Sequence, residues 1–431
     1  MKNKIIIATT VILCAFNAFA QDSQKEMKEI KYRRSSLHTI LIESDNFPKK
    51  DQVLSAYYGA EFPDKYDNHN IGEKSFNPAK YSSTKEESDT PETINKYMKD
   101  SQIAKKLVSK WYNRAADGSF DTSLIEERGA FNASFIDATT AKKANLGNAM
   151  ISTAGEELLN NTFVVVSKMK FIENEPVARV IRDGAILALS RAPSIVQALG
   201  TKAAQLAYEK AKEGYSVWTT SYLYKLKWDD ATQNTFFEEM YAEKGQMTPE
   251  KKAEYENTDL FNMEFIGSEK ATSLVTFSLT EKRTEEQIIK LSVTRNIDKV
   301  FSKLQKNYDV FKTKVPLYTG YPITAKIGMK EGLEGGEKFE VLEQSQDLKT
   351  GKIEYKRIGK IKVNKKLIWD NRANLSDLIS TPANETASTE NKSALLAGNE
   401  NSSSSENKPI DRTTFKGGKK FGAGLLIRQL K

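Results

Sequence analysis

The chain has 431 residues, 39% of them hydrophobic and 28% charged, and its formal net charge is +8. This length and composition allow two or three domains with ordinary hydrophobic cores, and they exclude a small module held together by disulfides. Basic and acidic residues are interspersed along most of the sequence, and no compact block of Lys and Arg indicates nucleic acid as a partner. The mild excess of positive charge instead favours the anionic surfaces of a cell envelope.

The first 20 residues have the pattern of an export signal. Lys2 and Lys4 precede an apolar run from Ile5 to Phe16, and Ala18-Phe19-Ala20 forms a small-x-small site before Gln21. The apolar run is too short to cross a bilayer about 30 Å thick, which makes a membrane anchor the weaker interpretation. We therefore expect a signal peptide that ends at Ala20.

The only cysteine, Cys14, lies inside this segment. A lipoprotein signal would need a small residue before the cysteine, and Leu13 is bulky. Cleavage would leave a chain without disulfides, thiol nucleophiles or zinc–thiolate sites. Such a chain fits a bacterial periplasm, because a protein of this size must then rely on its hydrophobic cores.

The segment after the signal is predicted to contain a strand, a long loop and a helix. The apolar centre of residues 33–43 allows a strand or a short helix and favours the strand, and residues 62–88 are rich in Asp, Asn, Pro, Lys and Ser without periodicity, as in a surface loop. Apolar residues recur at helical spacing over 94–112, which predicts a helix with Trp111 as its core anchor. A short capped helix is expected over 120–128.

Residues 137–171 are predicted to organise the core. Asp137 can cap a helix whose apolar residues recur up to Asn160-Asn161, and residues 162–166 then form a continuous run of mostly β-branched residues. Such a run is typical of a strand covered on both faces. We expect this strand to lie in the middle of an α/β domain.

Two further helices are predicted over 177–189 and 194–212, separated by Pro193. A long strand follows over 215–228, with Trp218, Tyr222 and Tyr224 on one face.

That aromatic face has two interpretations. At this spacing aromatic rings more often form a core between a sheet and its helices, and the helices over 137–160 and 194–212 are then expected to cover them. If Trp218, Tyr222 and Tyr224 were exposed, they would instead form a binding face for a glycan or a peptide.

The remaining third of the chain is predicted to change from helix to short strands. Residues 261–266 and 273–279 favour a hairpin across Gly267-Ser268, and residues 284–308 favour a six-turn helix that begins with capping-box spacing. Short strands cut by Gly and Pro are then expected over 311–317, 324–329, 338–343, 353–363 and 366–369.

The end of the chain is predicted to close this β-domain after an insert. Residues 375–414 lose aromatics and gain Ser, Asn and Glu, which predicts a disordered segment. The apolar residues 422–430 are then expected to return as a final strand.

Few residues favour a catalytic or metal site. His38 and His69 are the only histidines, and neither has a partner at metal-ligand spacing. No G-x-S-x-G stretch supports a serine nucleophile. Asp229-Asp230 and Glu238-Glu239 could pair as acid and base, but such charges are more common at helix starts and on exposed helical faces.

Two glycine-containing segments are weaker candidates. Gly332–Gly336 resembles a phosphate-binding loop but lacks its Lys-Ser/Thr ending, so a β-turn is the simpler interpretation. The basic residues 416–420 could touch anionic lipid or polysaccharide, although a solvated glycine loop is the simpler interpretation. We therefore expect no catalytic residue, no metal and no cofactor.

One resemblance concerns the segment Gly332–Val363. Its start contains Gly332, Gly336, Phe339 and Val341, and it continues with a Thr350-Gly351 turn and with Ile358-Gly359-Lys360-Ile361-Lys362-Val363. These residues resemble the C-terminal β-domain of the flagellar assembly protein T type, and the resemblance implies a small barrel. The long insert after Trp369 departs from that pattern.

A second resemblance concerns the order of elements further upstream. Arg34-Ser35-Ser36-Leu37 with Ile40-Leu41-Ile42-Glu43, helix 137–160, Phe163–Val166 and strand Tyr215–Lys227 are similar to the α/β core of curli-secretion-channel-like envelope proteins. Together the two resemblances imply an exported assembly or envelope component. They transfer no pore or binding residue, because none matches.

Together these features predict an exported α+β protein. A signal peptide over 1–20 precedes residues 21–115, which lead into the core with a strand, a surface loop and a helix. An α/β core domain with a helix-covered sheet is expected over 116–310. A small β-barrel-like domain with the insert 375–414 is expected over 311–431.

The expected function is that of a non-catalytic structural or assembly protein in the periplasm or at the outer-membrane periphery of a Gram-negative-type bacterium. Its expected partners are envelope proteins or outer-membrane components, and the sequence leaves a homo-oligomer open. One alternative is a secreted glycan- or peptide-binding protein that uses Trp218, Tyr222 and Tyr224. A hydrolase with dispersed carboxylates and hydroxyls is the third interpretation.

Overall fold

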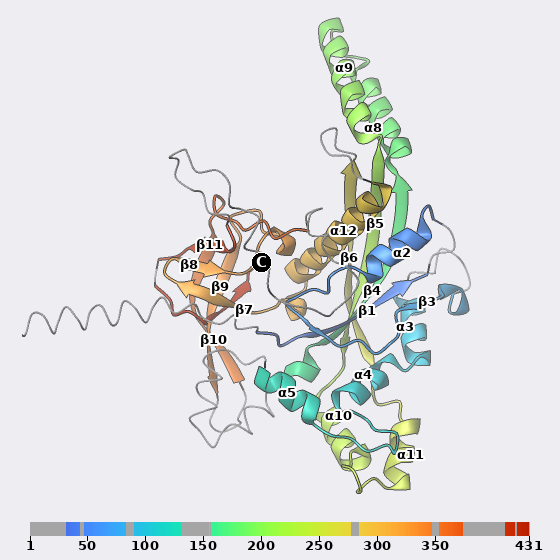
Figure 1. Ribbon diagram of the computed structural model, residues 1–431, viewed down its shortest axis with the longest axis vertical. Coiled ribbons are helices and arrows are strands. Elements are labelled where there is room, and N and C mark those ends of the chain that lie inside the picture. Colours follow the sequence, from blue (N-terminus) through green and yellow to red (C-terminus); the bar gives the residue numbers. More distant parts are fainter. Residues whose placement is uncertain are drawn as a thin grey trace, which may run out of the picture.

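A helix-covered sheet and a separate small barrel make up the protein (Figure 1). The α+β fold predicted from the sequence is confirmed. This computed structural model describes residues 32–43, 47–82, 90–131, 155, 157–276, 284–346, 353–373, 410–418 and 420–430.

The sheet is ordered around the predicted central strand. Its path runs β2-β1-β4-β5-β6, and the short β3 also pairs with β1. The strands are β1 Ser36–Ile42, β2 Asp67–Asn68, β3 Ser75–Phe76, β4 Thr162–Glu173, β5 Gly214–Leu226 and β6 Met263–Thr276. β4 pairs in parallel with β1 and antiparallel with β5, and Phe163 to Val166 are fully buried. The prediction of a central strand covered on both faces is therefore confirmed.

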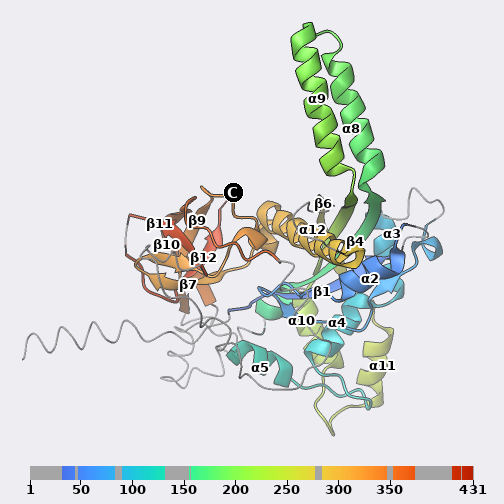
Figure 2. The same ribbon diagram turned by 45° about the horizontal axis from the view of Figure 1, so that its top comes forward.

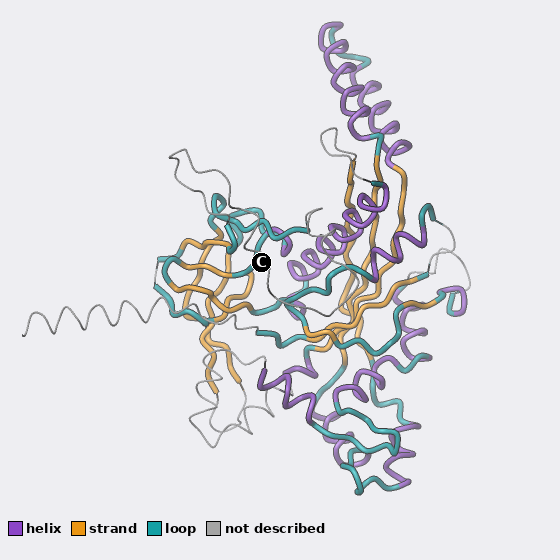
Figure 3. The backbone as a smooth tube through the Cα atoms, viewed as in Figure 1, coloured by secondary structure: helices purple, strands orange, loops and turns teal. Residues whose placement is uncertain are grey.

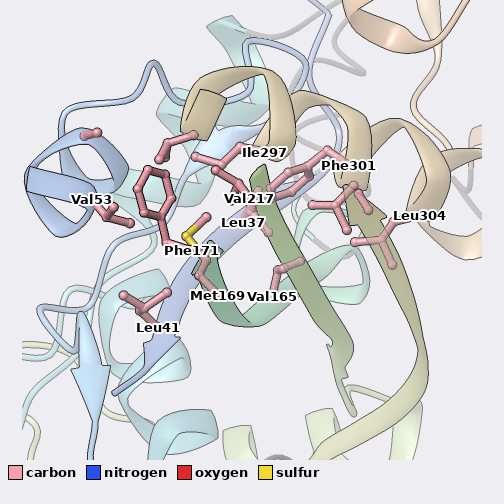
Figure 4. Packing of buried hydrophobic residues seen from close by; sticks show 14 of the residues in the cluster. Leu37, Leu41, Val53, Val165, Met169, Phe171, Val217, Ile297, Phe301 and Leu304 are labelled. Atoms are coloured by element: carbon pink, nitrogen blue, oxygen red, sulfur yellow. The ribbon is translucent and has the colours of Figure 1, made fainter. Parts of the chain in front are cut away.

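Helices cover both faces of the sheet. Successive residues of a strand point to opposite faces, so the residues of β4 belong alternately to two clusters. Phe163 and Val165 pack in one cluster with α2 (Lys50–Tyr58) and α12 (Glu285–Asn307), part of which is drawn in Figure 4. Val164 and Val166 pack in another cluster with α3 (Pro91–Asp100) and α4 (Ile103–Trp111). The sheet is thus the middle one of three layers.

A third cluster extends the core beyond the sheet. It joins α4 to α5 (Ser123–Phe131), to the π-helical turn Phe236–Met240, which follows α10 (Asp230–Thr235), and to α11 (Pro249–Asn257). Trp111 is fully buried there, and its indole N–H donates to Thr162 Oγ1 (2.9 Å). The prediction of Trp111 as a core anchor is confirmed.

Two predicted elements differ from the structure. The helix over 94–112 is divided into α3 and α4, because the chain turns at Gln102, whose φ is 51°. The predicted hairpin over 261–279 is wrong for its described residues, which form the single strand β6, because β5 offers a partner along its length. The predicted turn residue Gly267 has another role: a Cβ there would lie 2.4 Å from the ring of Tyr308.

The helix predicted over 137–160 lies mostly outside the described residues. Of this range, residues 155 and 157–160 are described, and they are helical. The helices predicted over 177–189 and 194–212 are present as α8 (Asn174–Leu189) and α9 (Ser194–Ala211).

The C-terminal part forms a closed six-stranded barrel in the order β10-β11-β8-β7-β12-β9. Its strands are β7 Val315–Gly320, β8 Ile323–Ala325, β9 Lys338–Gln346, β10 Ile353–Val363, β11 Thr413–Lys416 and β12 Leu426–Gln429. β12 pairs with both β9 and β7, so the predicted closure by the final strand is confirmed. The strand predicted over 366–369 is wrong, because this segment is a turn with one isolated bridge from Trp369 to Gly328.

Most of the predicted insert 375–414 lies outside the described residues. Residues 410–414 are described, and Thr413 and Thr414 belong to β11.

Candidate functional site

The aromatic row predicted on β5 is not an open face. Trp218 is 47% exposed, whereas Tyr222 is 8% exposed and Tyr224 is fully buried. Tyr222 and Tyr224 pack against α3 and α4, and the Tyr224 hydroxyl donates to the carbonyl of Pro91 (3.2 Å). Two of the three rings therefore belong to the core. Of the two helices expected to cover them, the one over 194–212 does not, and the one over 137–160 lies mostly outside the described residues.

Both histidines are buried in the fold. His69 stacks on Trp111 with 4.5 Å between ring centroids, and its Nε2 lies 3.1 Å from the carbonyl of Leu107. Arg128 lies 3.1 Å from His69 Nδ1, so the neutral ring accepts there and donates from Nε2. Burial lowers the pKa of His69 well below its usual value and that of His38 to about 4. The ring of His69 thus contacts both α4 and α5.

The acidic residues of the pairs 229–230 and 238–239 have different roles. The Asp229 carboxylate caps α10 by accepting from the amide and the hydroxyl of Thr232, at 2.8 Å each. Asp230, Glu238 and Glu239 are exposed. This arrangement is a helix cap with solvated neighbours, as the simpler interpretation of the sequence expects.

The glycine segment 332–336 is a turn that already holds a carboxylate. The amides of Glu334 and Gly335 donate to the Glu337 carboxylate at 2.9–3.1 Å. These are the donors that a phosphate would need in such a loop, and here they bind a side chain of the protein itself. In the basic segment 416–420, Lys416 lies in β11 and pairs with Lys362 of β10, while residue 419 lies outside the described residues. Among the residues that the structure describes, no cluster of His, Cys, Asp and Glu could hold a metal ion.

An open groove of about 920 Å³ lies between α3, α4 and residues 258–263. Its charged lining consists of Lys80, Lys96, Lys99, Lys105, Asp100 and Asp259. Asp100 accepts from the Tyr81 hydroxyl (3.0 Å), and Lys105 donates to the carbonyl of Glu256 (2.9 Å). The lining contains the two carboxylates Asp100 and Asp259 and no histidine.

The most unusual feature is a helical hairpin that projects from the sheet. α8 and α9 are inserted between β4 and β5, and they extend away from the rest of the molecule (Figures 1 and 2). The backbone trace shows the same arrangement (Figure 3). The hairpin therefore covers neither face of the sheet, and the prediction that α9 does so is wrong.

Specific contacts hold the two helices of the hairpin together. The Glu175 carboxylate accepts from Arg179 (2.6 Å) and from the Tyr208 hydroxyl (2.9 Å). The Arg182 guanidinium lies 4.4 Å from the centre of the Tyr208 ring. Near the tip, a Cβ on Gly200 would lie 2.5 Å from a methyl group of Leu189, so glycine permits the close approach of the helices.

The outer surface of the hairpin is apolar. Seven of the fifteen large hydrophobic side chains that are exposed in the described residues belong to it. They are Val180, Ile181, Leu187, Ile195, Val196, Leu199 and Leu206, with exposed fractions from 49% to 73%. Contiguous apolar patches larger than a few hundred Å² are rare on soluble monomers and mark interaction surfaces. We call this set the hairpin patch.

The sequence contains part of the evidence for the hairpin patch. Residues 184–201 contain one charged residue, Arg191, and this scarcity of charge was a usable signal. Periodicity located both helices but could not indicate whether the sheet covers them. In the described part of the chain, no helix has the length and apolarity needed to cross a bilayer.

The chain matches no protein-family model, no curated protein and no solved structure. The functional interpretation therefore starts from the hairpin patch.

Proposed function

We propose that this protein is a non-catalytic component of a bacterial envelope, exported by its N-terminal signal, and that it docks on other envelope material through the α8–α9 hairpin. The observation that carries the proposal is the hairpin patch, whose side chains are 49–73% exposed.

The energetic argument is the hydrophobic effect. Burial of apolar surface stabilises by roughly 25 cal/mol per Å², and each of the seven side chains leaves about half or more of its surface in water. The two helices of the hairpin are joined by the hydrogen bond from Tyr208 to Glu175 and by the cation–π contact of Arg182 with Tyr208, so the hairpin does not need these side chains to keep its shape. A partner that covers the patch would gain that burial energy.

The titratable residues support a binding protein over a hydrolase. His38 and His69 are buried and neutral, Asp229 caps a helix, and Glu337 closes a turn. His69, Asp229 and Glu337 each have a structural role that accounts for their environment. The resemblances of residues 332–363 and of the upstream α/β elements to envelope assembly proteins support the same proposal.

The test compares a hairpin variant with a matched surface variant. Ile181→Ser, Leu187→Ser, Ile195→Ser and Leu199→Ser are combined in the first. The control combines Val310→Ser, Tyr321→Ser, Leu367→Ser and Ile410→Ser, which are exposed apolar side chains elsewhere.

Both variants are expressed with the signal in a Gram-negative host, and periplasmic and envelope fractions are separated. We expect the wild type and the control in the envelope fraction and the hairpin variant in the soluble periplasm, with unchanged thermal unfolding for all three. A hairpin variant that fractionates like the wild type would contradict the proposal.

A further inference from the structure

We infer that the hairpin patch binds the surface of an anionic phospholipid bilayer, with the hairpin lying in the interfacial region. The inference rests on the proposed function, because it identifies the partner of the same surface.

The first support is the distribution of charge along the hairpin. On α8 the charged side chains end at Asp183, and on α9 they resume at Lys202. The 18 residues between them contain only Arg191. The distal part of the hairpin is therefore almost free of charge, and the one charge that it carries is positive.

The second support is the arrangement of the apolar side chains. Ile195, Leu199 and Leu206 on α9 follow helical spacing and form one exposed stripe. On α8, Leu187 follows Val180 by seven residues, whereas Ile181 lies about 100° from Val180 around the helix. Lys202 and Lys210 lie within the stripe of α9, and Arg179, Arg182 and Asp183 lie on α8. Neither helix is therefore apolar all round as membrane-spanning helices are.

Four of these side chains point to the same side of the hairpin. Gly200 and Leu189 face each other across it. At about 100° per residue from these two positions, and with the helices running in opposite directions, Ile181 of α8 points to the same side as Ile195, Leu199 and Leu206 of α9, whereas Val180 and Leu187 point away from α9. That side can rest on a flat surface, and the hairpin stands clear of the sheet and the barrel (Figure 2).

The positions of the charged residues on the hairpin agree with binding at the interfacial depth of a bilayer. Interfacial helices bury their apolar face by about 5–10 Å, whereas a bilayer crossing needs about 20 apolar residues. At that depth the long side chains of Arg191 and Lys202 can reach the phosphate groups. A guanidinium binds phosphate oxygens in a bidentate manner, which explains a single arginine at the turn of an otherwise uncharged tip.

A second copy of the chain fits this surface less well. An 18-residue helix is about 27 Å long, and two helices side by side are about 20 Å wide, so one face of the hairpin covers roughly 540 Å². Stable protein interfaces bury about 800 Å² per partner. A bilayer has no such minimum, because it extends beyond the hairpin on every side.

The test uses single cysteines in the chain that begins at Gln21, which otherwise contains none. Ala203→Cys lies on the apolar side of α9, Gln205→Cys lies on its opposite side, and Ala253→Cys lies on α11 at the far end of the molecule (Figure 1). Each is labelled with an environment-sensitive fluorophore and mixed with vesicles of phosphatidylcholine, with or without about a third of phosphatidylglycerol.

We expect a blue shift at position 203 with the anionic vesicles, and no shift at positions 205 and 253. The fourfold serine variant of the hairpin is expected to lose the shift. Arg191→Gln should weaken binding to the anionic vesicles about fivefold, as expected for one basic residue at a charged membrane surface, and should leave the weak binding to neutral vesicles unchanged.

Other outcomes overturn the inference in distinguishable ways. Equal binding to neutral and anionic vesicles would remove the role of Arg191 and of lipid charge. If no vesicle binds and sedimentation shows oligomers that the serine variant lacks, the partner is a second copy, and the proposed function survives. If no vesicle binds, no oligomer forms and fractionation is independent of the hairpin, both proposals fail.

Discussion

α12 and α9 are both long helices with apolar residues at helical spacing, yet their environments are opposite. α12 has eleven buried residues, and α9 has none in the described structure. α12 lies across the sheet and packs on Val165 and its neighbours, whereas α9 points away from it (Figures 1 and 4). The comparison teaches that periodicity identifies an apolar face but does not identify what covers that face.

The polar sides of the two helices differ as well. Lys299 and Lys303 of α12 donate to the carbonyls of Thr272 (2.8 Å) and Lys270 (2.6 Å) in β6. The hydroxyl of Tyr308, just after the helix, donates to the carbonyl of Ser268 (3.0 Å). β6 is at one end of the sheet, and unpaired groups at such an edge invite a further strand. α12 thus protects the sheet edge as well as the core.

The largest expected effect is the difference between an aspartate introduced into buried β4 and an aspartate introduced into exposed α9. Val165→Asp places an unpaired carboxylate between two apolar layers, which costs several kcal/mol and should prevent folding. Leu199→Asp in the hairpin patch should alter the free energy of unfolding by less than about 0.5 kcal/mol, because the side chain is already 67% exposed. Thermal unfolding by circular dichroism measures both. A soluble Val165→Asp protein that melts cooperatively would contradict the central role of β4.

The next effect concerns the protected edge. Lys299→Met with Lys303→Met removes two donors from the carbonyls of β6 and should cost about 1 kcal/mol for each lost hydrogen bond. The bare edge should also aggregate faster, which light scattering at elevated temperature can follow. Lys96→Met with Lys99→Met on the exposed side of α3 is the matched control, and comparable aggregation of this control would show that the edge is not the cause.

A smaller effect concerns Asp298 on α12. Burial raises its pKa to about 6 from a usual 3.8, although Lys330 opposes the shift. Between these pH values the folded protein binds more protons than the unfolded chain, so this group lowers stability as pH rises through that window. Asp298→Asn should therefore be more stable than the wild type by ~1–2 kcal/mol at pH 8 and about equal at pH 4.

Urea unfolding at both pH values checks this expectation. The exposed Asp230→Asn is its control and should show no such pH-dependent gain. An Asp298→Asn variant with the same difference from wild type at pH 4 and pH 8 would exclude titration of Asp298 as the cause.

The smallest expected effect is confined to the hairpin. Gly200→Val would place a side chain against Leu189. Because a Cβ alone would lie 2.5 Å from a methyl group of Leu189, the two helices should separate near the tip. Hydrogen exchange should become faster in α8 and α9 and stay unchanged in β4 and α12. Ala198→Val, at an exposed position of the same helix, is the control.

A good part of the fold could be predicted from local signals. The β-branched run at 162–166 indicated β4, the capping box at Thr284 indicated α12, and the short strands after residue 311 indicated the barrel. The continuous strand β6 was missed because Gly267-Ser268 has turn composition, while its pairing with β5 is a long-range contact. The break at Gln102 was missed because neither Gly nor Pro marks it.

The candidate site could be predicted only in its parts. The aromatic residues Trp218, Tyr222 and Tyr224 attracted attention because large rings often bind ligands, yet two of them are core residues of the sheet. The helix over 194–212 was expected to cover these rings for the opposite reason, since apolar side chains at helical spacing are usually covered.

The sequence by itself determined most of the segments that form helices and strands, where apolar residues lie on each, and that the last strand belongs to the barrel. Only the tertiary structure decided that α3 and α4, and not α9, cover Tyr222 and Tyr224, and that the hairpin stands free. The physical reason is that secondary structure follows from contacts a few residues apart, which the sequence displays. Which surfaces remain in water depends on how distant segments pack together, and no local pattern contains that information.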